Sequence, residues 1–330
     1  MVGHYGRAPV ILQRACGGHI RAHLPRRLRP LQHLRMCDTR ASQHNRTPKT
    51  PMTSPPRDLE ETVARALAED IGPRDVTALL VPDEPARATI VTREDAVLAG
   101  RPYVEAVFRR LDPQVHIDWS AADGDRVIAG QVLCRLALRA RALLTGERTA
   151  LNFLQLLSGT ATATSAYVDA IASTDCRILD TRKTVPGLRL AQKYAVRCGG
   201  AENHRLGLYD RVLIKENHIL AAGSIAAAVA AARALPDPVP VEVETETLAE
   251  LSQALEAGAD FIMLDEFSLD DLRRGVEINR AHPRRARLEA SGSITLDNVR
   301  EIARTGVDFI SIGSITKHIR AVDLSLRIQR

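Results

Sequence analysis

The sequence has little of several features that mark common classes of protein. Aromatic residues make up only 3% of the 330 residues, too few for the stacking platforms that bind single-stranded nucleic acid. No apolar run approaches the roughly 20 residues that a membrane-spanning helix needs. The chain also has no Walker A loop and no GxGxxG motif, which are the usual signs of a nucleoside triphosphate or dinucleotide site. We therefore expect a soluble globular protein that has no nucleic-acid or membrane partner.

The cysteines form no pattern that indicates a metal site or a disulfide framework. The chain has five of them, and no two stand in a CxxC pair: Cys16, Cys37, Cys134, Cys176 and Cys198. Scattered cysteines of this kind are typical of proteins in a reducing compartment. The cysteine pattern therefore predicts a cytoplasmic protein.

The basic net charge of +5 originates in the first part of the chain. Residues 1–51 contain nine Arg, one Lys and one acid, for a net charge of +9, whereas the remainder contains 35 basic and 39 acidic residues, for −4. We expect 1–51 to be a disordered basic tail, or residues that precede a natural start at Met52. A transit peptide is the alternative, but Pro25, Pro30 and the glycines at 17 and 18 interrupt any long amphipathic helix there.

Two different patterns of secondary structure follow this tail. A helix beginning near Asp58, several strands with hairpin signals and a helix at 103–111 predict an α+β unit, and two long helices at 145–157 and 160–171 link it to the second half of the chain. Short apolar strands then alternate with helices, which favours parallel pairing in an α/β barrel. The expected strands are 177–179, 212–214, 240–243, 261–264, 288–290 and 309–312, and the helices between them include 248–256, 269–280 and 296–304.

A sequence pattern that occurs twice shows where the strands of this second region end. Residues 258–265 (GADFIMLD) and 306–313 (GVDFISIG) each combine a helix-end glycine, a turn and a buried strand. In barrels of this kind the chemistry lies at the carboxyl ends of the strands. We therefore expect the polar or small residues at five strand ends to gather in one place: Lys215, Glu244, Asp265, Ser291 and Gly313.

Cations are concentrated in the glycine-punctuated segment 180–218. Those that follow or lie between apolar strands form a predicted cationic group: Arg182, Lys183, His204, Arg205 and Lys215. The arginine fork meets a carboxylate with two hydrogen bonds, and lysine adds a point charge. A solvated basic surface is the alternative, but cations at two strand ends favour a pocket for a polyanionic small molecule such as a dicarboxylate.

Two acids and two small-residue loops complete the predicted site. Glu244 and Asp265 face each other across the strand ends, where they can hold Mg²⁺ on a diphosphate or stabilise a developing positive charge. The Ser291-Gly292-Ser293 and Gly313-Ser314 segments precede helices, and their backbone amides fit a phosphate cradle.

Several motifs resemble the quinolinate phosphoribosyltransferases, also called carboxylating nicotinate-nucleotide pyrophosphorylases. They are 147–152 (ERTALN), 180–187 (DTRKTVPG), 200–205 (GAENHR), 214–218 (IKENH), 243–245 (VET), 263–265 (MLD), 289–292 (EASG) and 313–318 (GSITKH). The resemblance spans about 58–330. One departure is Ser293, where the family commonly has Gly or Asn, and a serine there can still donate a hydrogen bond.

The resemblance implies a fold and an assembly. It implies an N-terminal α/β sandwich at 52–158, joined by a final helix at 317–330, and an incomplete seven-stranded α/β barrel at 159–316. It also implies a homodimer, with a hexamer left open, in which the partner subunit's Arg148 completes the active site.

The resemblance also implies a reaction and its residues. Phosphoribosyl would pass from phosphoribosyl pyrophosphate to quinolinate with decarboxylation, in the presence of Mg²⁺, giving nicotinate mononucleotide for NAD biosynthesis. The implied catalytic residues are Lys183, Glu244 and Asp265, of which the two acids also serve as metal ligands. The implied substrate-binding residues are Arg148, Thr181, Arg182, Lys183, His204, Arg205, Lys215, Glu244, Asp265, Ser291, Gly292, Ser293, Gly313 and Ser314.

Three other interpretations of the same residues stay open. A related phosphoribosyltransferase for another pyridine or a pterin-like substrate would share the fold, although the full set of carboxylate-binding cations argues against it. A Schiff-base lyase would use Lys215 as its nucleophile, which borohydride trapping with a ketoacid tests. A non-enzymatic binding protein has no use for paired acids facing a cationic group.

Overall fold

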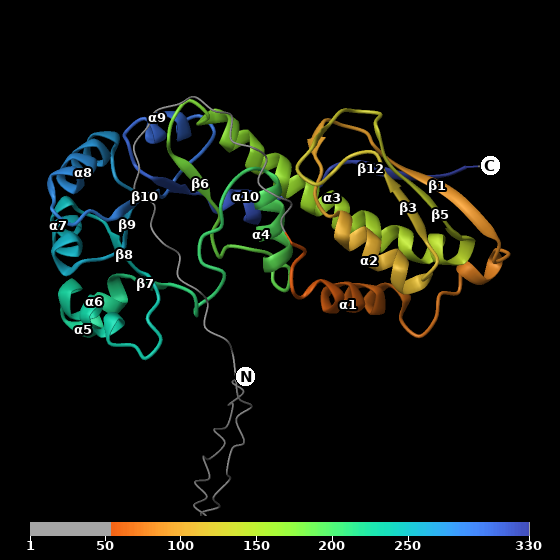
Figure 1. The fold of residues 1–330 in the computed structure, drawn as a ribbon, viewed down its shortest axis with the longest axis horizontal. Coiled ribbons are helices and arrows are strands. Elements are labelled where there is room, and N and C mark those ends of the chain that lie inside the picture. Colours follow the sequence, from red (N-terminus) through yellow and green to blue (C-terminus); the bar gives the residue numbers. More distant parts are fainter. Residues whose placement is uncertain (1–53, 330) are drawn as a thin grey trace, which may run out of the picture. The chain divides into compact units, whose positions relative to one another are not determined.

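The computed structural model describes residues 54–329, and its first part is built on an antiparallel sheet (Figure 1). The predictions for residues 1–51 lie outside the described residues. The sheet has the order β12-β1-β5-β3, with β1 at Pro85–Thr92, β3 at His116–Trp119, β5 at Val132–Arg139 and β12 at Leu324–Gln329. Smaller elements beside it are η1 (Ala78–Leu80), β2 (Ala96–Val97) and β4 (Arg126–Val127).

Three helices accompany this sheet: α1 (Leu59–Ile71), α2 (Arg101–Leu111) and α3 (Ala140–Ala170). Strand residues such as Ile90 and Leu136 are buried in one core with Tyr103 and Phe108 of α2 and Leu154 of α3. Alternate residues of β5, such as Arg135, are exposed, as expected for a sheet covered on one face. The predicted N-terminal α/β sandwich is confirmed.

The helix α3 corrects the prediction of two helices at 145–157 and 160–171, because the segment is one helix of 31 residues. Gly159 lies inside this helix, between the two predicted ones. A Cβ atom at Gly159 would collide with the carbonyl oxygen of Arg320, and the backbone N–H of Val322 donates to Gln155 O at 3.1 Å. Gly159 therefore admits the C-terminal segment against the helix.

The predicted final helix at 317–330 is also wrong. Only the short α10 (Ser314–Lys317) is helical, and the chain then forms the strand β12. Leu324, Leu326 and Ile328 alternate with polar residues, which is a strand period, and β12 pairs antiparallel with β1. The chain end does return to the N-terminal domain, but as an edge strand.

The second part of the chain forms one parallel sheet with the order β6-β11-β10-β9-β8-β7. Its strands are β6 (Arg177–Leu179), β7 (Val212–Ile214), β8 (Val241–Thr245), β9 (Phe261–Asp265), β10 (Arg287–Ser291) and β11 (Phe309–Ser311). All six predicted strands are confirmed. The seventh is reduced to one parallel bridge between Leu179 and Glu202, and among the described residues no ladder pairs β6 with β7.

Helices follow the strands of this sheet and cover its outer face. They are α4 (Arg189–Cys198), α5 (Glu216–Ala222), α6 (Ile225–Arg233), α7 (Leu248–Ala257), α8 (Leu269–Ala281) and α9 (Val299–Ala303). Val241, Val243 and Ile262 are buried in the core with residues of these helices. Because side chains alternate along a strand, Glu242 and Glu244 point to the opposite, inner face.

The glycines of the repeated sequence pattern adopt the backbone conformation that is expected at a helix end. Gly258, which ends α7, and Gly306 have φ values of 79° and 95°, in the left-handed region that glycine adopts without strain. Among the described residues, no helix has the length and apolar character that crossing a membrane requires.

Candidate active site

A cavity of about 350 Å³ lies on the inner face of the parallel sheet, at the carboxyl ends of its strands. Eight of the residues predicted from the sequence line it: Thr181, Arg182, Lys183, His204, Arg205, Lys215, Glu244 and Ser291. Leu213, Met263, Glu289 and Ser311 complete the lining and were not predicted. The structure therefore brings the cations and one of the two predicted acids into a single space.

The other predicted residues lie outside this lining. Asp265 is the register partner of Ser291 across β9 and β10, so it stands at the same sheet edge. Gly313 is packed against Lys183 so closely that a Cβ atom would meet the lysine side chain. Ser314 lies 3.5 Å from the hydroxyl of Tyr167. Arg148 is exposed on α3.

The arginines of the cavity are crowded together. Burial and the nearby charge of Arg182 lower the pKa of Arg205, and the buried Nε of Arg182 has no hydrogen-bond partner among residues 54–329. Two cations that repel each other in a part-buried site are stabilised by an anion placed between or beside them. This arrangement favours a ligand with negative charge.

Lys215 and Glu244 form an ion pair inside the cavity. Lys215 follows β7, Glu244 lies in the neighbouring β8, and Ile214 pairs with Val243, so adjacent strand ends bring the two side chains together. The lysine side chain keeps 42% of its surface exposed, whereas the glutamate keeps 12%. Lys215 is thus accessible to a second anion.

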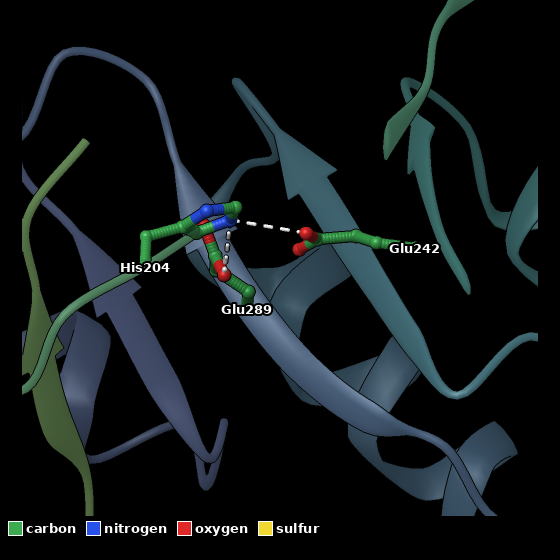
Figure 2. Close-up of side chains that lie close together, drawn as sticks. All are labelled: His204, Glu242 and Glu289. Atoms are coloured by element: carbon green, nitrogen blue, oxygen red, sulfur yellow. Dashed lines mark ion pairs between the residues drawn. The ribbon is translucent and has the colours of Figure 1, made fainter. Parts of the chain in front are cut away.

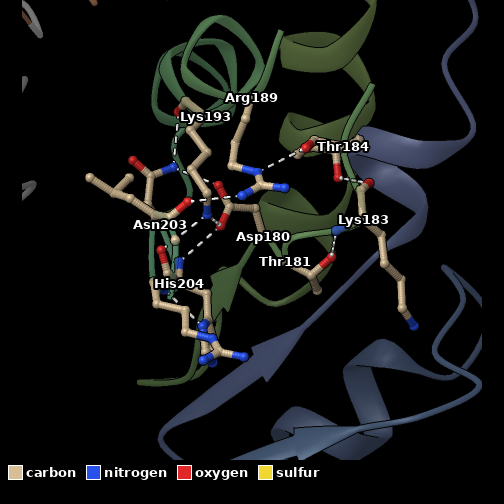
Figure 3. A network of polar contacts seen from close by, with 12 residues as sticks. Asp180, Thr181, Lys183, Thr184, Arg189, Lys193, Asn203 and His204 are labelled. Carbon is tan, nitrogen blue, oxygen red and sulfur yellow. Dashed lines mark hydrogen bonds and ion pairs between the residues drawn. The ribbon is translucent and has the colours of Figure 1, made fainter. Parts of the chain in front are cut away.

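A buried ionic network supports the turn that carries His204 and Arg205 (Figure 3). Asp180, fully buried after β6, forms an ion pair with Lys193 of α4. Its carboxylate also accepts from Asn203 Nδ2 at 2.6 Å and from the backbone N–H of His204 at 2.9 Å. Burial raises the pKa of Asp180 and lowers that of Lys193, and the attraction between their charges opposes both shifts. The network fixes the turn without entering the cavity.

A second buried cluster joins β8, β10 and the loop that carries His204, at the inner side of the cavity (Figure 2). His204 Nε2 lies 3.0 Å from Glu242 Oε2 and 3.4 Å from Glu289 Oε2. Burial and the charge of Glu242 raise the pKa of Glu289 well above its usual range. Burial also tends to raise the pKa of Glu242, but His204 and Arg211 lower it overall.

The predicted phosphate loop after β10 has an unusual backbone. Ser293 and Glu266 have φ values of 47° and 54°, which are uncommon for residues other than glycine. Ser293 Oγ donates to Glu266 Oε1 at 2.9 Å, and a Cβ atom at Gly292 would collide with the Glu266 carboxylate. The serine that departs from the family pattern is thus used to hold the loop in shape.

The acids at the sheet edge have the carboxylate oxygens that Mg²⁺ prefers as ligands. Mg²⁺ is usually held by one or two carboxylates, waters and phosphate oxygens. Asp265 is half-buried, and its side chain makes no hydrogen bond or ion pair within the described part of the chain. Glu244 is engaged by Lys215. Asp265 is therefore the more available of the two predicted ligands.

A larger hollow of about 460 Å³ lies near α1, α2 and α4, away from the strand ends. In its lining, Glu105 pairs with Arg109 and Asp123 accepts from the Tyr194 hydroxyl, and Arg101 stacks over Trp119. Because the residues predicted from the strand ends line the smaller cavity, we assign the site to that cavity.

Sequence reasoning missed the buried supports of the site, namely Asp180, Lys193, Glu242 and Glu289. A signal was present for two of them. In 241–245 (VEVET) and 287–291 (RLEAS) an acid interrupts a buried strand on the face shared with a predicted site residue, and buried acids require partners. Lys193 lies in a helix and looks like any surface lysine in the sequence.

Comparisons with known proteins agree with this site. The Quinolinate phosphoribosyl transferase N-terminal and C-terminal domain families match residues 75–158 and 160–327. A relative from Synechocystis, named as a probable carboxylating nicotinate-nucleotide pyrophosphorylase, is 44% identical over 80% of this chain and 90% of its own length. A Bacillus subtilis relative with the same name is 40% identical over 82% and 93%.

A solved structure extends the likeness to three dimensions. The nicotinate-nucleotide pyrophosphorylase from Francisella tularensis superposes with a TM-score of 0.81 at 48% identity, covering 84% of this chain and 98% of that one. The motifs that line the cavity thus stand in a chain matched along both of its parts and over nearly the full length of its relatives. The chain belongs to the quinolinate phosphoribosyltransferase family.

Proposed function

We propose that this protein transfers the phosphoribosyl group of phosphoribosyl pyrophosphate to quinolinate, releasing pyrophosphate and carbon dioxide and leaving nicotinate mononucleotide for NAD biosynthesis. Membership of the family and the names of its relatives support the reaction. The observation that carries the substrate assignment is the part-buried cation group of one cavity. Within the described part of the chain Arg182 and Arg205 form no ion pair, and burial and the charge of Arg182 lower the pKa of Arg205.

The cation group suits the two adjacent carboxylates of quinolinate. Arg182 and Arg205 offer forked donors, and Lys215 adds a point charge that is still accessible. At an effective dielectric of about 20, one cation at 4 Å from an anion contributes about 4 kcal/mol before desolvation. Leu213 and Met263 supply apolar lining for the face of the pyridine ring.

The chemistry follows from the charges that develop. When the ring nitrogen bonds to the ribose carbon and the pyrophosphate oxygen leaves, positive charge builds on the ribose. Glu244 and Asp265, at the edge of the cavity, are placed to stabilise that charge electrostatically. The nitrogen then carries a positive charge, so the neighbouring carboxylate leaves as carbon dioxide and its bonding electrons stay on the ring carbon, which takes a proton.

Magnesium and the small-residue loops belong to the same proposal. Asp265 and Glu244 would hold Mg²⁺, which when bound neutralises the charge of the diphosphate. The loop at Ser291–Ser293 and the turn at Gly313–Ser314 would receive phosphate oxygens on backbone N–H groups. Lys183, exposed beside Gly313, would contact the departing pyrophosphate.

We also propose a homodimer in which the partner subunit's Arg148 completes the cavity. Arg148 of the same chain is exposed on α3 and does not line the cavity, which supports a role across an interface. The domains would divide as expected, with 52–158 and 159–316 as the two folding units, and the cysteine pattern supports a cytoplasmic location.

A product assay tests the reaction. Quinolinate labelled with ¹⁴C in the carboxyl group next to the ring nitrogen is incubated with phosphoribosyl pyrophosphate and Mg²⁺. The proposal predicts one labelled carbon dioxide for each nicotinate mononucleotide, with none when phosphoribosyl pyrophosphate is omitted. A ribosylated product that keeps the label, or the absence of any product, would overturn it.

A further inference from the structure

A fully buried carboxylate lies behind the cavity and holds the loop that carries Arg205. Glu242 of β8 does not line the cavity and is 0% exposed. Its Oε2 atom lies 3.0 Å from His204 Nε2 (Figure 2). The same atom lies 3.3 Å from Arg211 Nη1. One oxygen atom therefore engages the residue before Arg205 and a residue at the far end of the same loop.

Both of these residues also hold Arg205. The backbone N–H of Arg205 donates to His204 Nδ1 at 2.7 Å, and the Arg205 guanidinium donates through Nη1 to the carbonyl oxygen of Arg211 at 3.3 Å. Nδ1 accepts this hydrogen bond, and Nε2 lies toward the carboxylates of Glu242 and Glu289. Both ring nitrogens of His204 are thus turned toward protein groups, so His204 acts mainly as a support for Arg205.

Arg211 is also held in place by neighbouring residues. Its guanidinium lies over the ring of Phe261, with its central carbon 4.0 Å from the ring centroid, and Phe261 is the register partner of Glu242 on the neighbouring strand. The loop between the two anchors is closed independently by Asp210, whose carboxylate accepts from the backbone N–H groups of Leu206 and Gly207.

We propose that Glu242 is a positioning residue for Arg205, fixing both its backbone and its guanidinium in the orientation that meets a substrate carboxylate. This inference rests on the proposed function, which assigns Arg205 to quinolinate. A forked donor contributes its full interaction only when its plane is held at the right angle. A support that reaches Arg205 from two sides provides this orientation without touching the substrate.

The same cluster of His204, Glu242 and Glu289 has the groups to ligate a metal ion. We favour positioning, because the oxygen of Glu242 nearest to His204 already has the Arg211 guanidinium beside it. A cation at the centre of the cluster would lie next to that positive charge. Metal analysis of the purified protein separates the two: a stoichiometric ion that is lost in Glu242→Gln would overturn the proposal.

Steady-state kinetics of Glu242→Gln provides the main test. The substitution keeps the shape of the side chain and removes its charge. We expect the KM for quinolinate to rise by roughly ten- to a hundredfold, as when a supporting partner is lost at a binding site, and the KM for phosphoribosyl pyrophosphate to change by less than about twofold. The matched control is Asp112→Asn, which alters a buried carboxylate outside the site and should change neither constant. Equal effects on both substrates would contradict a positioning role.

A double-mutant cycle makes the claim sharper. Since Glu242 acts through Arg205, Glu242→Gln should add less than about twofold to the quinolinate KM of an Arg205→Ala enzyme. Full additivity would overturn the inference. If Arg205→Ala itself leaves the quinolinate KM unchanged, the proposed function fails, whereas an effect of Arg205→Ala without one of Glu242→Gln refutes only the role of Glu242.

A second variant covers the case in which Glu242→Gln does not fold. Arg211→Met removes one of the two arms that reach Arg205 and leaves Glu242 paired with His204. It should raise the quinolinate KM selectively as well, and an unchanged KM would contradict the proposed connection.

Discussion

The two sheets of this protein differ in the kinds of residue that they bury. In the antiparallel sheet the inward residues, such as Ile90, Cys134 and Leu136, are apolar, and Asp112 is the only buried charged residue within the described range 75–158. In the range 160–327, five buried residues are acids, lysine or histidine: Asp180, Lys193, His204, Glu242 and Glu289. All five belong to the two polar networks that support the cavity, and His204 and Glu289 also line it.

This difference separates stability from function. Buried charges cost desolvation energy, and well-packed apolar residues in their place are often at least as stable. The parallel sheet keeps an apolar outer face under its helices and carries the charges on its inner face. The antiparallel domain therefore supplies packing, whereas the inner face of the parallel sheet supplies a preorganised field for an anionic substrate.

The largest expected effect comes from splitting the active site between subunits. Arg148→Ala and Lys183→Ala should each abolish activity. If the site is shared in a homodimer, mixing and reassociating the two variants should restore about one quarter of the wild-type activity, because half of the dimers are hybrids with one intact site each. Each variant reassociated with itself is the control. A mixture that stays inactive would exclude a shared site.

Removing a cation from the inner face should affect binding strongly and folding little. For Arg205→Ala we expect kcat/KM for quinolinate to fall by about a hundredfold or more, since a charged hydrogen bond in a part-buried site is lost. The thermal unfolding midpoint should stay the same or rise, because repulsion from Arg182 is relieved. Normal saturation by quinolinate would refute the dicarboxylate role.

The antiparallel sheet should show the reverse behaviour. Leu136, which is 2% exposed in the core of the sandwich, should cost about 2–5 kcal/mol of unfolding free energy when replaced by Ala, because the substitution leaves a cavity. Chemical denaturation measures this loss. At a temperature where the variant is folded, its quinolinate KM should match the wild type, and a selective change in KM would contradict the division of roles.

The smallest effect concerns the amino end of the parallel sheet, opposite the cavity. Asp260 Oδ2 lies 2.9 Å from Arg233 Nη2 and accepts from the Val241 N–H at 2.8 Å. Burial alone would raise the pKa of Asp260, but Arg233 and this N–H group lower it overall. A lowered carboxyl pKa stabilises the fold above the unfolded value of about 3.9, and this stabilisation is lost as the pH falls through the folded value.

Asp260→Asn should therefore lower the unfolding midpoint by a few degrees at pH 7, and the difference from wild type should shrink below about pH 4. Differential scanning calorimetry over a pH series measures both. The exposed Asp237→Asn is the control and should differ little from wild type at any pH. A difference that stays constant down to pH 3 would show that the charge of Asp260 is not responsible.

The sequence predicted the parts of the site that follow local rules. Lys215 and Glu244 could be placed because each directly ends or follows an apolar strand, and the glycines at 258 and 306 marked the turns between elements. Glu242 was not assigned, because its partners His204 and Arg211 come from a loop that only the folded sheet brings beside it. A charged residue within a strand does not show which residue will be its partner, because that contact forms only in the folded protein.

The errors in the fold have the same origin. One helix runs through Gly159 where two helices were predicted, and the residue that a side chain at this position would meet is Arg320, far along the chain. The alternation of Leu324, Leu326 and Ile328 with polar residues is typical of a strand, whereas the resemblance to the family implied a final helix. A barrel was expected from the number of strands, whereas the segment between β6 and β7 carries the turn with His204 and Arg205 in place of a full strand.

The most direct test is whether the protein prefers quinolinate, an acceptor with two carboxylates, to nicotinate, an acceptor with one. Pyrophosphate release is measured with phosphoribosyl pyrophosphate and Mg²⁺, with quinolinate or nicotinate as the acceptor. A cavity lined by a cluster of cations should reject the acceptor that lacks one carboxylate, so we predict that kcat/KM for quinolinate exceeds that for nicotinate by at least about a hundredfold. Equal use of both acceptors, or turnover of nicotinate alone, would contradict the assignment of the inner-face cations to a dicarboxylate.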